Sequence, residues 1–384
     1  MSFNDYIDRR SSESLKWNCY PNDVLPLWVA DTDFRSPPEV IDALHQRVDH
    51  GIFGYSIPPE GLDQVVIDRV KRLYDWDICQ EHIAYVPGIV TGFTIMLRAL
   101  CEKGDAVIFQ SPAYPPFIGS PKASGLVGIQ NPMYRDDQGI YRLDFDRFER
   151  QIIENKVKVY ILCNPQNPTG RVFCKEELQK LAEICLRHNV TICSDEIHGD
   201  IIFDGRKHTP IASLDPEISR ITATFMAPSK TYNIAGLHAS VAIIPDEGLR
   251  TTYEQYRQYL IGNPSLLALV AAKAAYEYGN GWLSEQIAYL QSNRDFIDDA
   301  ITQGTLPGVS WSKPESTFLG WLDCHELPVE GGLFEFFMEK AKVCLNDGST
   351  YGEGGKGFLR LNFGCTQAVL KNGLERMSSA IRDI

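Results

Sequence analysis

Short apolar runs alternate with helical patterns of apolar positions between about residues 60 and 280. Most of the runs lack the polar and apolar alternation of a strand with one wet face, so they are typical of strands covered on both faces. Between two of them, residues 175–189 place apolar side chains on one helical face and charges on the other. The strands predicted in this way are 105–109, 157–162, 190–193, 221–226 and 239–244.

This alternation predicts an α/β fold, in which a mostly parallel sheet is sandwiched by helices. The pattern changes near residue 283, where a long amphipathic helix (283–303) precedes short strand-like runs and a terminal helix near 366–382. We therefore predict a large domain over 46–282 and a smaller α+β domain formed by 1–45 and 283–384. Ligands of parallel sheets bind at the carboxyl ends of the strands, so polar residues that follow the predicted strands are the first site candidates.

Composition narrows the classes of partner. The chain has 384 residues and a net charge of −13, which disfavours binding to nucleic acid or to an anionic membrane surface. Its ten cysteines include no C-x-x-C pair, so we expect neither a disulfide framework nor a metal site. The polar start and the short apolar stretch at 265–276, which Lys273 interrupts, predict no signal peptide and no membrane span. Together these features predict a cytoplasmic protein.

Lys230 is an unusual residue at the end of an apolar strand. It follows the run 221–226 and lies between Ser229 and Thr231. An ammonium group in the interior is costly unless it is paired, neutralised or covalently bonded. A desolvated lysine can act as a nucleophile or a base, whereas a lysine in a solvated loop has no such role. The apolar run before Lys230 favours the first interpretation.

Three other polar segments follow predicted strands. The turn at Pro87-Gly88 leads into a helix that begins near Val90, which is either a phosphate-binding helix start or an ordinary turn. The run "NPQNPTG" (164–170) holds the amides of Asn164 and Asn167 in a stiff, proline-rich turn. In "ICSDEIHGD" (192–200), Asp195 is a helix cap, an ion-pair partner or the holder of a proton on a ring nitrogen, and His198 by itself is typical of a structural histidine.

These motifs occur in an order that resembles a known family. "NPQNPTG", "SDEIH" and "SKTYNIAGL" are similar to the asparagine, aspartate and lysine motifs of fold type I pyridoxal-phosphate enzymes in the class I/II aminotransferase superfamily. A narrower resemblance is to the cystathionine β-lyase, or carbon–sulfur lyase, branch that includes MalY and PatB. The segments that carry it are "PLWVADTDF", "FGYSIPPEG", "SPAYPPF", "SDEIHGDI" and "LNDGSTYGEGGKGFLRLNFG".

The resemblance implies pyridoxal 5′-phosphate as cofactor and assigns a role to each matching residue. Lys230 would bond to the cofactor aldehyde and later take the Cα proton, and Asp195 would hold the proton on the ring nitrogen. Asn167 would donate to the phenolic oxygen of the ring and also contact substrate. Tyr114 would stack on the ring as a catalytic and cofactor-binding residue. His198 stands where many aminotransferases have a cofactor-binding tyrosine.

The remaining roles concern the phosphate and the substrate. The backbone N–H groups of Ile89 and Val90 and the hydroxyl of Ser229 would bind the phosphate. Tyr55 would reach the phosphate of a neighbouring subunit, which implies a homodimer with a shared active site. Arg360 would bind the α-carboxylate of an amino-acid substrate, and Ala30 lies in a segment that lines the pocket in the family. His238 replaces an arginine that often binds the phosphate.

The resemblance favours one reaction over two alternatives. It implies α,β-elimination of cystathionine or another S-substituted cysteine to a thiol, pyruvate and ammonia. An aminotransferase uses Lys230, Asp195 and Arg360 in the same way, so those residues do not distinguish the two reactions. A regulatory protein that binds another protein through its surface is the third hypothesis.

Overall fold

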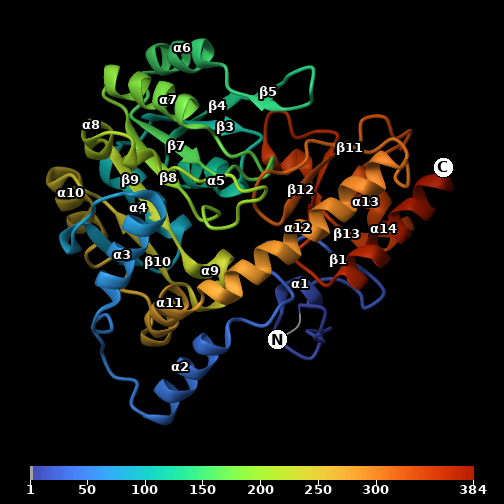
Figure 1. Ribbon diagram of the computed structural model, residues 1–384. Coiled ribbons are helices and arrows are strands. Elements are labelled where there is room, and N and C mark those ends of the chain that lie inside the picture. The colour runs from blue at the N-terminus through green and yellow to red at the C-terminus, as the bar shows by residue number, and fades with distance from the viewer. Residues whose placement is uncertain (1–2) are drawn as a thin grey trace.

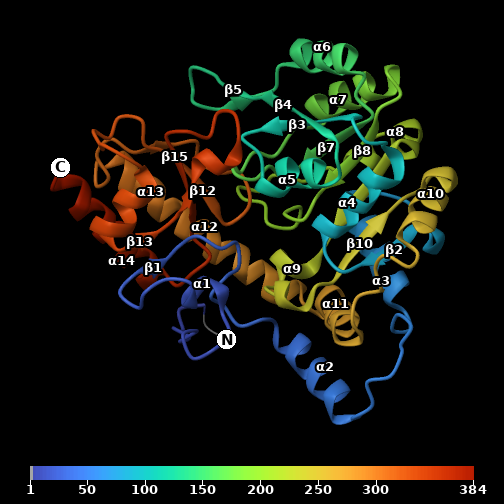
Figure 2. The same ribbon diagram turned by 180° about the vertical axis from the view of Figure 1, so that it is seen from behind.

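The computed structural model describes residues 3–384. A seven-stranded sheet forms the centre of the larger part of the molecule, in the order β2-β10-β9-β8-β7-β3-β4 (Figures 1 and 2). All pairings from β9 through β4 are parallel, whereas β10 is antiparallel to both of its neighbours. The strands are β2 (Ile83–Val86), β3 (Ala106–Ser111), β4 (Val127–Pro132), β7 (Val159–Cys163), β8 (Thr191–Asp195), β9 (Thr222–Met226) and β10 (Ser240–Ile243).

Helices cover both faces of this sheet, which explains the unbroken apolar runs. Alternate side chains of a strand point to opposite faces. On β7, Tyr160 and Leu162 belong to a cluster with α6 (Phe145–Asn155) and α7 (Lys175–Arg187). Val159 and Ile161 belong to another cluster, with α4 (Ile89–Leu100), α5 (Pro115–Ala123) and α10 (Glu247–Arg257). The predicted sandwich of helices and a mostly parallel sheet is confirmed.

A smaller antiparallel sheet lies in the C-terminal part of the chain, in the order β11-β12-β15-β14. Its strands are β11 (Ser310–Trp311), β12 (Leu319–Asp323), β14 (Asn346–Asp347) and β15 (Phe358–Asn362). The N-terminal segment joins this part, because β1 (Leu25–Pro26) pairs in parallel with β13 (Val343–Cys344). A short hairpin, β5 (Tyr134–Arg135) with β6 (Tyr141–Arg142), completes the strands of the described chain.

Helix α12 (Asn280–Thr302) runs from the region of α9 toward the smaller sheet (Figures 1 and 2). The predicted helix at 283–303 therefore begins three residues earlier than expected, and the predicted domain boundary after residue 282 falls inside it. The division into two domains stays a prediction. The other helices are α1 (Leu15–Asn18), α2 (Pro38–Asp49), α3 (Leu62–Tyr74), α8 (Pro216–Arg220), α9 (Pro228–Thr231), α11 (Leu266–Tyr278), α13 (Leu333–Phe336) and α14 (Gln367–Arg382).

Five of the seven strands of the larger sheet were predicted with bounds, and β2 was predicted only as the strand that ends at Pro87-Gly88, so one strand was not predicted. Strand β4 lies at the sheet edge, and its first residues, Val127 and Gly128, are exposed. An edge strand with exposed positions does not carry the continuous apolar run by which its neighbours were recognised. The predicted strands and the helices near 175–189 and 366–382 all occur, with ends shifted by a few residues.

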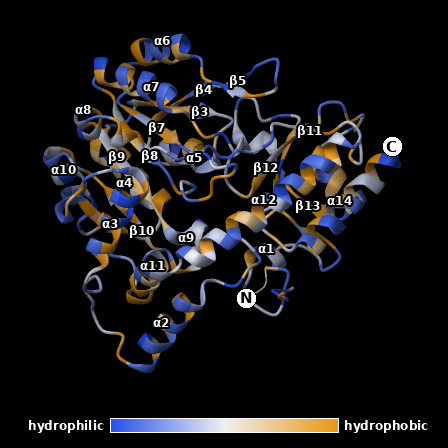
Figure 3. Cartoon of the chain, in the orientation of Figure 1, coloured by the Kyte–Doolittle hydropathy of each residue, from blue (hydrophilic) through white to orange (hydrophobic). Residues whose placement is uncertain are grey.

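The connection between α2 and α3, residues 51–61, has neither helix nor strand and projects from the rest of the molecule. Figure 3 shows a hydrophobic stretch in it, just after α2. Ile52, Phe53, Tyr55 and Ile57 are all exposed there. Among the helices of residues 3–384, none has the length and apolar character needed to span a bilayer.

Candidate active site

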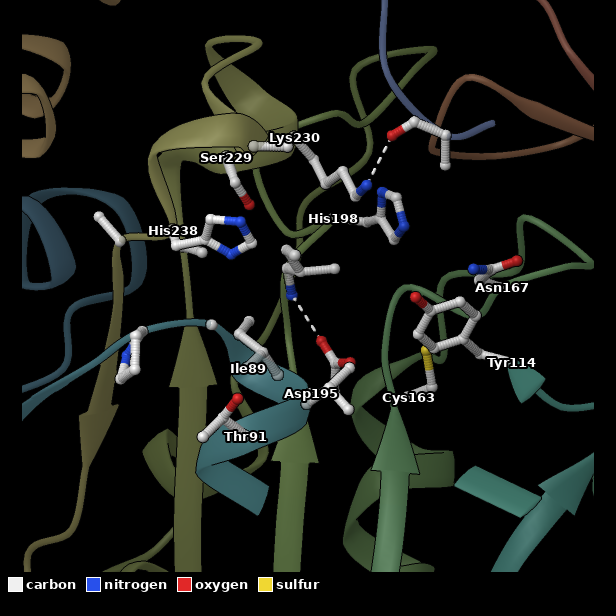
Figure 4. Close-up of a pocket in the computed structure, with 18 residues that line it drawn as sticks. Ile89, Thr91, Tyr114, Cys163, Asn167, Asp195, His198, Ser229, Lys230 and His238 are labelled. Carbon is white, nitrogen blue, oxygen red and sulfur yellow. Dashed lines mark hydrogen bonds between the residues drawn. The ribbon is translucent and has the colours of Figure 1, made fainter. Parts of the chain in front are cut away.

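A cavity of about 340 Å³ opens at the carboxyl ends of the parallel strands (Figure 4). Asp195 is the last residue of β8, Asn164 follows β7, and Lys230 lies in the short helix that follows β9. Neighbouring parallel strands end at the same sheet edge, so segments far apart in sequence meet here. The predicted site residues that line the cavity are Ala30, Ile89, Val90, Tyr114, Asn167, Asp195, His198, Ser229 and Lys230.

Lys230 extends into this cavity from α9. Its Nζ donates to the backbone carbonyl of Ala30 at 2.5 Å, a bond drawn as a dashed line in Figure 4. Burial lowers the pKa of Lys230 to about 8, and the charge of Arg360 acts in the same direction. The carboxylates of Asp31 and Asp195 oppose this shift without cancelling it. Near neutral pH a substantial fraction of the amine is therefore uncharged and nucleophilic.

Asp195 is a buried carboxyl group, and few hydrogen bonds compensate for its loss of contact with water. Only 5% of the residue is exposed, and its Oδ1 accepts one bond, from the backbone N–H of Ile197 at 3.1 Å. Burial raises the pKa of Asp195 to about 7, although the bond from Ile197 and the charge of Lys230 oppose the rise. A buried carboxylate gains most from an additional N–H donor, above all a cationic one.

Arg360 lies just behind Asn167, on β15. This strand is internal to the smaller sheet, between β12 and β14, which rules out the surface position of an edge-strand arginine. Its guanidinium donates to Asn167 Oδ1 at 3.2 Å, to the carbonyl of Trp28 at 3.0 Å and to Asn346 Oδ1 at 2.7 Å. Within residues 3–384 no carboxylate lies within 4.0 Å of it, and its Nε has no hydrogen-bond partner. A buried cation that contacts only neutral groups is suited to an incoming carboxylate.

The bond from Arg360 also fixes the orientation of Asn167. Because Oδ1 of Asn167 accepts from Arg360, its Nδ2 is free to donate on the other side. Figure 4 shows this amide nitrogen turned toward the side of the cavity where Tyr114 and His198 lie. The side chain of Asn167 thus presents an N–H donor to the cavity, as its predicted bond to a cofactor oxygen requires.

His198 and Tyr114 form walls of the cavity. His198 is 2% exposed, and burial together with the charges of Lys230 and Arg360 lowers its pKa to about 3. The ring is therefore neutral, and no group in the described part of the chain bonds to its Nδ1. Burial raises the pKa of Tyr114, with Asp195 adding to the shift, so its hydroxyl stays protonated. Tyr114 lies directly before α5, and its ring packs edge-on against Phe117 at 5.8 Å.

The opposite end of the cavity is a helix start. Gly88 precedes α4 with a φ of 109°, a conformation strained for any residue with a Cβ. The first N–H groups of α4, from Ile89 onward, have no acceptor within the helix and carry the positive end of its dipole. Ser229 and His238 line the same end. A helix start of this kind is suited to anions, and to phosphate above all.

Tyr55 is the one predicted site residue that lies far from this cavity. Its side chain is fully exposed on the connection between α2 and α3. It does not line the cavity of its own chain. Its predicted role requires a second subunit and stays a prediction.

The structure also adds residues that sequence reasoning missed. Thr91, Cys163 and Ile197 line the cavity, and Asn346 and Tyr351 hold Arg360, whose guanidinium lies 5.4 Å from the centre of the Tyr351 ring. Thr91 had a signal, because it lies one residue after Val90 in the proposed helix start. Asn346 and Tyr351 lie in the quoted segment "LNDGSTYGEGGKGFLRLNFG", but nothing in it assigned them a role. The pairing of β14 with β15 places Asn346 opposite Arg360.

These features fit the cofactor that the resemblance implies. The helix start suits its phosphate, the uncompensated carboxyl of Asp195 suits a protonated ring nitrogen, and Asn167 Nδ2 suits the phenolic oxygen. The amine of Lys230, with its lowered pKa, suits the aldehyde. Each group of pyridoxal phosphate thus has a matching donor, acceptor or nucleophile in one cavity.

Comparisons with known proteins agree with this site. The model of the family "Aminotransferase class I and II" matches residues 22–377. Cystathionine beta-lyase PatB of Bacillus subtilis is 40% identical to this chain, over 99% of this chain and 100% of PatB. Protein MalY of Escherichia coli is 31% identical, over 100% of this chain and 99% of MalY. Cystalysin from Treponema denticola, whose crystal structure contains pyridoxal 5′-phosphate, has a TM-score of 0.95 at 33% identity and covers 100% of this chain and 99% of its own. The chain therefore belongs to the class I and II aminotransferase family, in the branch that contains PatB and MalY.

Proposed function

We propose that the protein is a pyridoxal-phosphate-dependent carbon–sulfur β-lyase. It removes the thiol from L-cystathionine or another S-substituted cysteine and leaves pyruvate and ammonia. Two observations support the proposal. Lys230, Asp195 and Asn167 line one cavity, and Arg360 bonds to Asn167 at its edge, which supports amino-acid chemistry with this cofactor. The choice of elimination rests on the full-length likeness to PatB, which is named a cystathionine beta-lyase.

The protein's own residues would divide the work as follows. When bound, pyridoxal phosphate draws negative charge away from the Cα of the amino acid. Asp195 holds a proton on the ring nitrogen, which keeps the ring electron-poor. Arg360 grips the α-carboxylate with its planar fork and so orients the amino acid. Lys230 takes the proton from Cα as a general base.

Product analysis tests the reaction. Purified protein with bound cofactor and L-cystathionine, without any keto acid, is expected to release pyruvate, ammonia and homocysteine in equal amounts. The measurement is a coupled pyruvate assay with thiol titration in parallel. If turnover begins only after a keto acid is added, the protein is an aminotransferase and the lyase proposal is wrong.

The lowered pKa of Lys230 predicts the pH dependence of cofactor capture. Only the neutral amine attacks the aldehyde, so the capture rate should rise with pH and level off above about 8. With a pKa of about 8 in place of 10.5, the neutral fraction at pH 7 is about 300-fold larger. Stopped-flow absorbance of cofactor-free protein mixed with pyridoxal phosphate measures this rate.

Asp195 loses its own proton near pH 7, so it could contribute to the same profile. The variant Asp195→Asn separates the two groups. Because the Asp195 charge raises the pKa of Lys230, the variant should show a midpoint at or slightly below that of the wild type. A midpoint near 10 in either protein would contradict the assignment of Lys230 as a desolvated amine.

We also propose a homodimer with a shared site, in which Tyr55 reaches the phosphate of the partner subunit. The exposed apolar side chains at residues 52–57, with Tyr55 among them, support this arrangement, since such stretches mark contact surfaces. The expectation of a cytoplasmic location is part of the same proposal.

Subunit mixing tests the shared site. Tyr55→Ala and Lys230→Ala should each be poorly active at limiting cofactor, whereas dissociated and re-formed mixtures should recover about a quarter of wild-type activity. The reason is that a hybrid dimer contains one site with both Lys230 and the partner's Tyr55 intact. A mixture no more active than its two components would show that Tyr55 does not complete a neighbouring site.

A further inference from the structure

The segment Leu27–Phe34, here called the strap, has no regular secondary structure although it lies beside the cavity. Backbone groups in such a position need partners other than a helix or sheet ladder of their own. Every carbonyl from Leu27 to Thr32 accepts a hydrogen bond. Most of the donors come from two places that are distant in sequence: the turn that carries Lys230, and strand β15. Lys16 and Arg9 of the N-terminal segment also donate, to the carbonyls of Asp31 and Thr32. The strap therefore connects the Lys230 turn and β15.

Asn233 holds the strap on the side of Lys230. Its Oδ1 accepts from the backbone N–H of Thr32 at 3.1 Å, and its Nδ2 donates to the carbonyls of Thr32 and Phe34 at 3.0 and 2.7 Å. In return, the hydroxyl of Ser36 donates to the carbonyl of Asn233 at 3.0 Å. Asn233 has a φ of 54°, a left-handed conformation that asparagine tolerates better than most residues. Both the oxygen and the nitrogen of the Asn233 side-chain amide thus bond to the backbone of the strap.

Asn362 holds the strap on the side of Arg360. It is fully buried on β15, and its Nδ2 donates to the carbonyls of Val29 and Asp31, the latter at 2.7 Å. Its Oδ1 accepts from the N–H of Gly364, so the amide orientation is fixed. The backbone N–H of Asn362 donates to the carbonyl of Leu27 at 2.9 Å. Two residues before Asn362 on the same strand, Arg360 donates to the carbonyl of Trp28.

The strap contacts both reactive ends of the site through neighbouring carbonyls. The carbonyl of Trp28 accepts from Arg360, and that of Ala30 accepts from Lys230. Two residues of chain span at most roughly 7 Å, so the strap limits how far apart the two side chains lie. We propose that Asn233 and Asn362 are positioning residues, which hold the strap between the Lys230 turn and β15 and thereby fix the spacing of the substrate-carboxylate site from the catalytic amine. This inference rests on the proposed function for Arg360 and Lys230.

The test variant is Asn233→Gly. Glycine adopts a φ of 54° without strain, so this change removes the three side-chain bonds and leaves the turn conformation available. The matched control is Asn189→Gly, since Asn189 also has a φ of 54° but is exposed at the end of α7, away from the cavity. Thermal unfolding of both variants, each with bound cofactor, shows that they fold.

Two readouts are needed, and one of them does not depend on turnover. In cofactor-free protein, amide hydrogen exchange of a peptide covering 27–34 should become faster in Asn233→Gly by about tenfold or more, with no such change in Asn189→Gly. In the holoenzyme, KM for the amino-acid substrate should rise by about tenfold while kcat changes less than about threefold, because Arg360 loses orientation and Lys230 stays bonded to the cofactor.

A second variant checks the other end of the strap. Asn362→Asp keeps the size and the acceptor for Gly364 but loses both donated bonds, so it should reproduce the local exchange and the rise in KM. Unchanged exchange at 27–34, a uniform increase over all peptides, or an unchanged KM would each overturn the proposal. If the wild-type protein acts on no S-substituted cysteine, the proposed function fails, while the exchange experiment still decides whether the strap is held as described.

Discussion

Replacing Lys230 by alanine is expected to lower kcat for thiol release by at least about 10⁴-fold. The variant loses both the nucleophile that captures the cofactor aldehyde and the base that takes the Cα proton. Lys230→Arg should be as inactive, because a guanidinium stays protonated and cannot act as that base. The measurement is pyruvate release under single-turnover conditions, with cofactor added in excess.

The matched control for this prediction is Lys273→Ala on α11, which also removes one ammonium group but lies outside the cavity. It should retain wild-type kcat. Lys230→Ala should also keep its fold, since it removes the cost of burying an amine, and the carboxyl group of Asp195, whose pKa rises further without the Lys230 charge, can take up a proton. Pyruvate release at the native rate by Lys230→Ala would show that another residue is the base.

Replacing Arg360 by alanine is expected to lower kcat/KM for the amino acid. The fall should correspond to a loss of roughly 2–5 kcal/mol in transition-state stabilisation, the cost of losing one partner of a buried, charge-assisted pair. Most of the loss should appear in KM, because the contact to the α-carboxylate exists both before and during the reaction. The KM of Arg360→Lys should lie between those of the wild type and Arg360→Ala, since lysine keeps the charge and loses the planar fork. Steady-state kinetics with cystathionine give both parameters.

Two controls make this result specific. Arg147→Ala removes an arginine of α6 that does not line the cavity, and it should leave KM unchanged. An amine substrate that lacks the α-carboxylate should react no worse with Arg360→Ala than with the wild type, because the lost contact was never made. Unchanged kinetics of Arg360→Ala with cystathionine would place the carboxylate site elsewhere.

Comparison of the predicted and observed strands shows which part of the fold is readable from sequence. Strands β3, β7, β8 and β9 were recognised because both faces are buried, and continuous apolar runs follow directly from that burial. Edge strand β4 was not recognised, because its exposed positions remove the pattern. The antiparallel direction of β10 was also invisible, since strand direction depends on the path of the connecting chain and not on composition.

The site divides in a similar way. Residues at or just after strand ends, such as Asn167, Asp195 and Lys230, could be singled out from the sequence. A polar group next to a buried strand is costly unless it has a partner or a function. Arg360 could be assigned only through the family resemblance, because its partners are two side chains and one backbone carbonyl from three separate segments. The strap is a further example: nothing in "LWVADTDF" indicates that its carbonyls are held by Asn233 and Asn362.

By itself, the sequence determined the α/β class, the strand ends that carry chemistry and the family, because those depend on local pattern and on motifs that are contiguous in the chain. Only the tertiary structure decided that, among the residues it describes, Arg360 is buried without a carboxylate partner, that the buried side chain of Asp195 has one backbone donor, and that an irregular segment joins Lys230 to Arg360. Those properties depend on desolvation and on contacts between residues about 200 or more positions apart, as from Lys230 to Ala30 and from Arg360 to Trp28. No local pattern encodes such contacts.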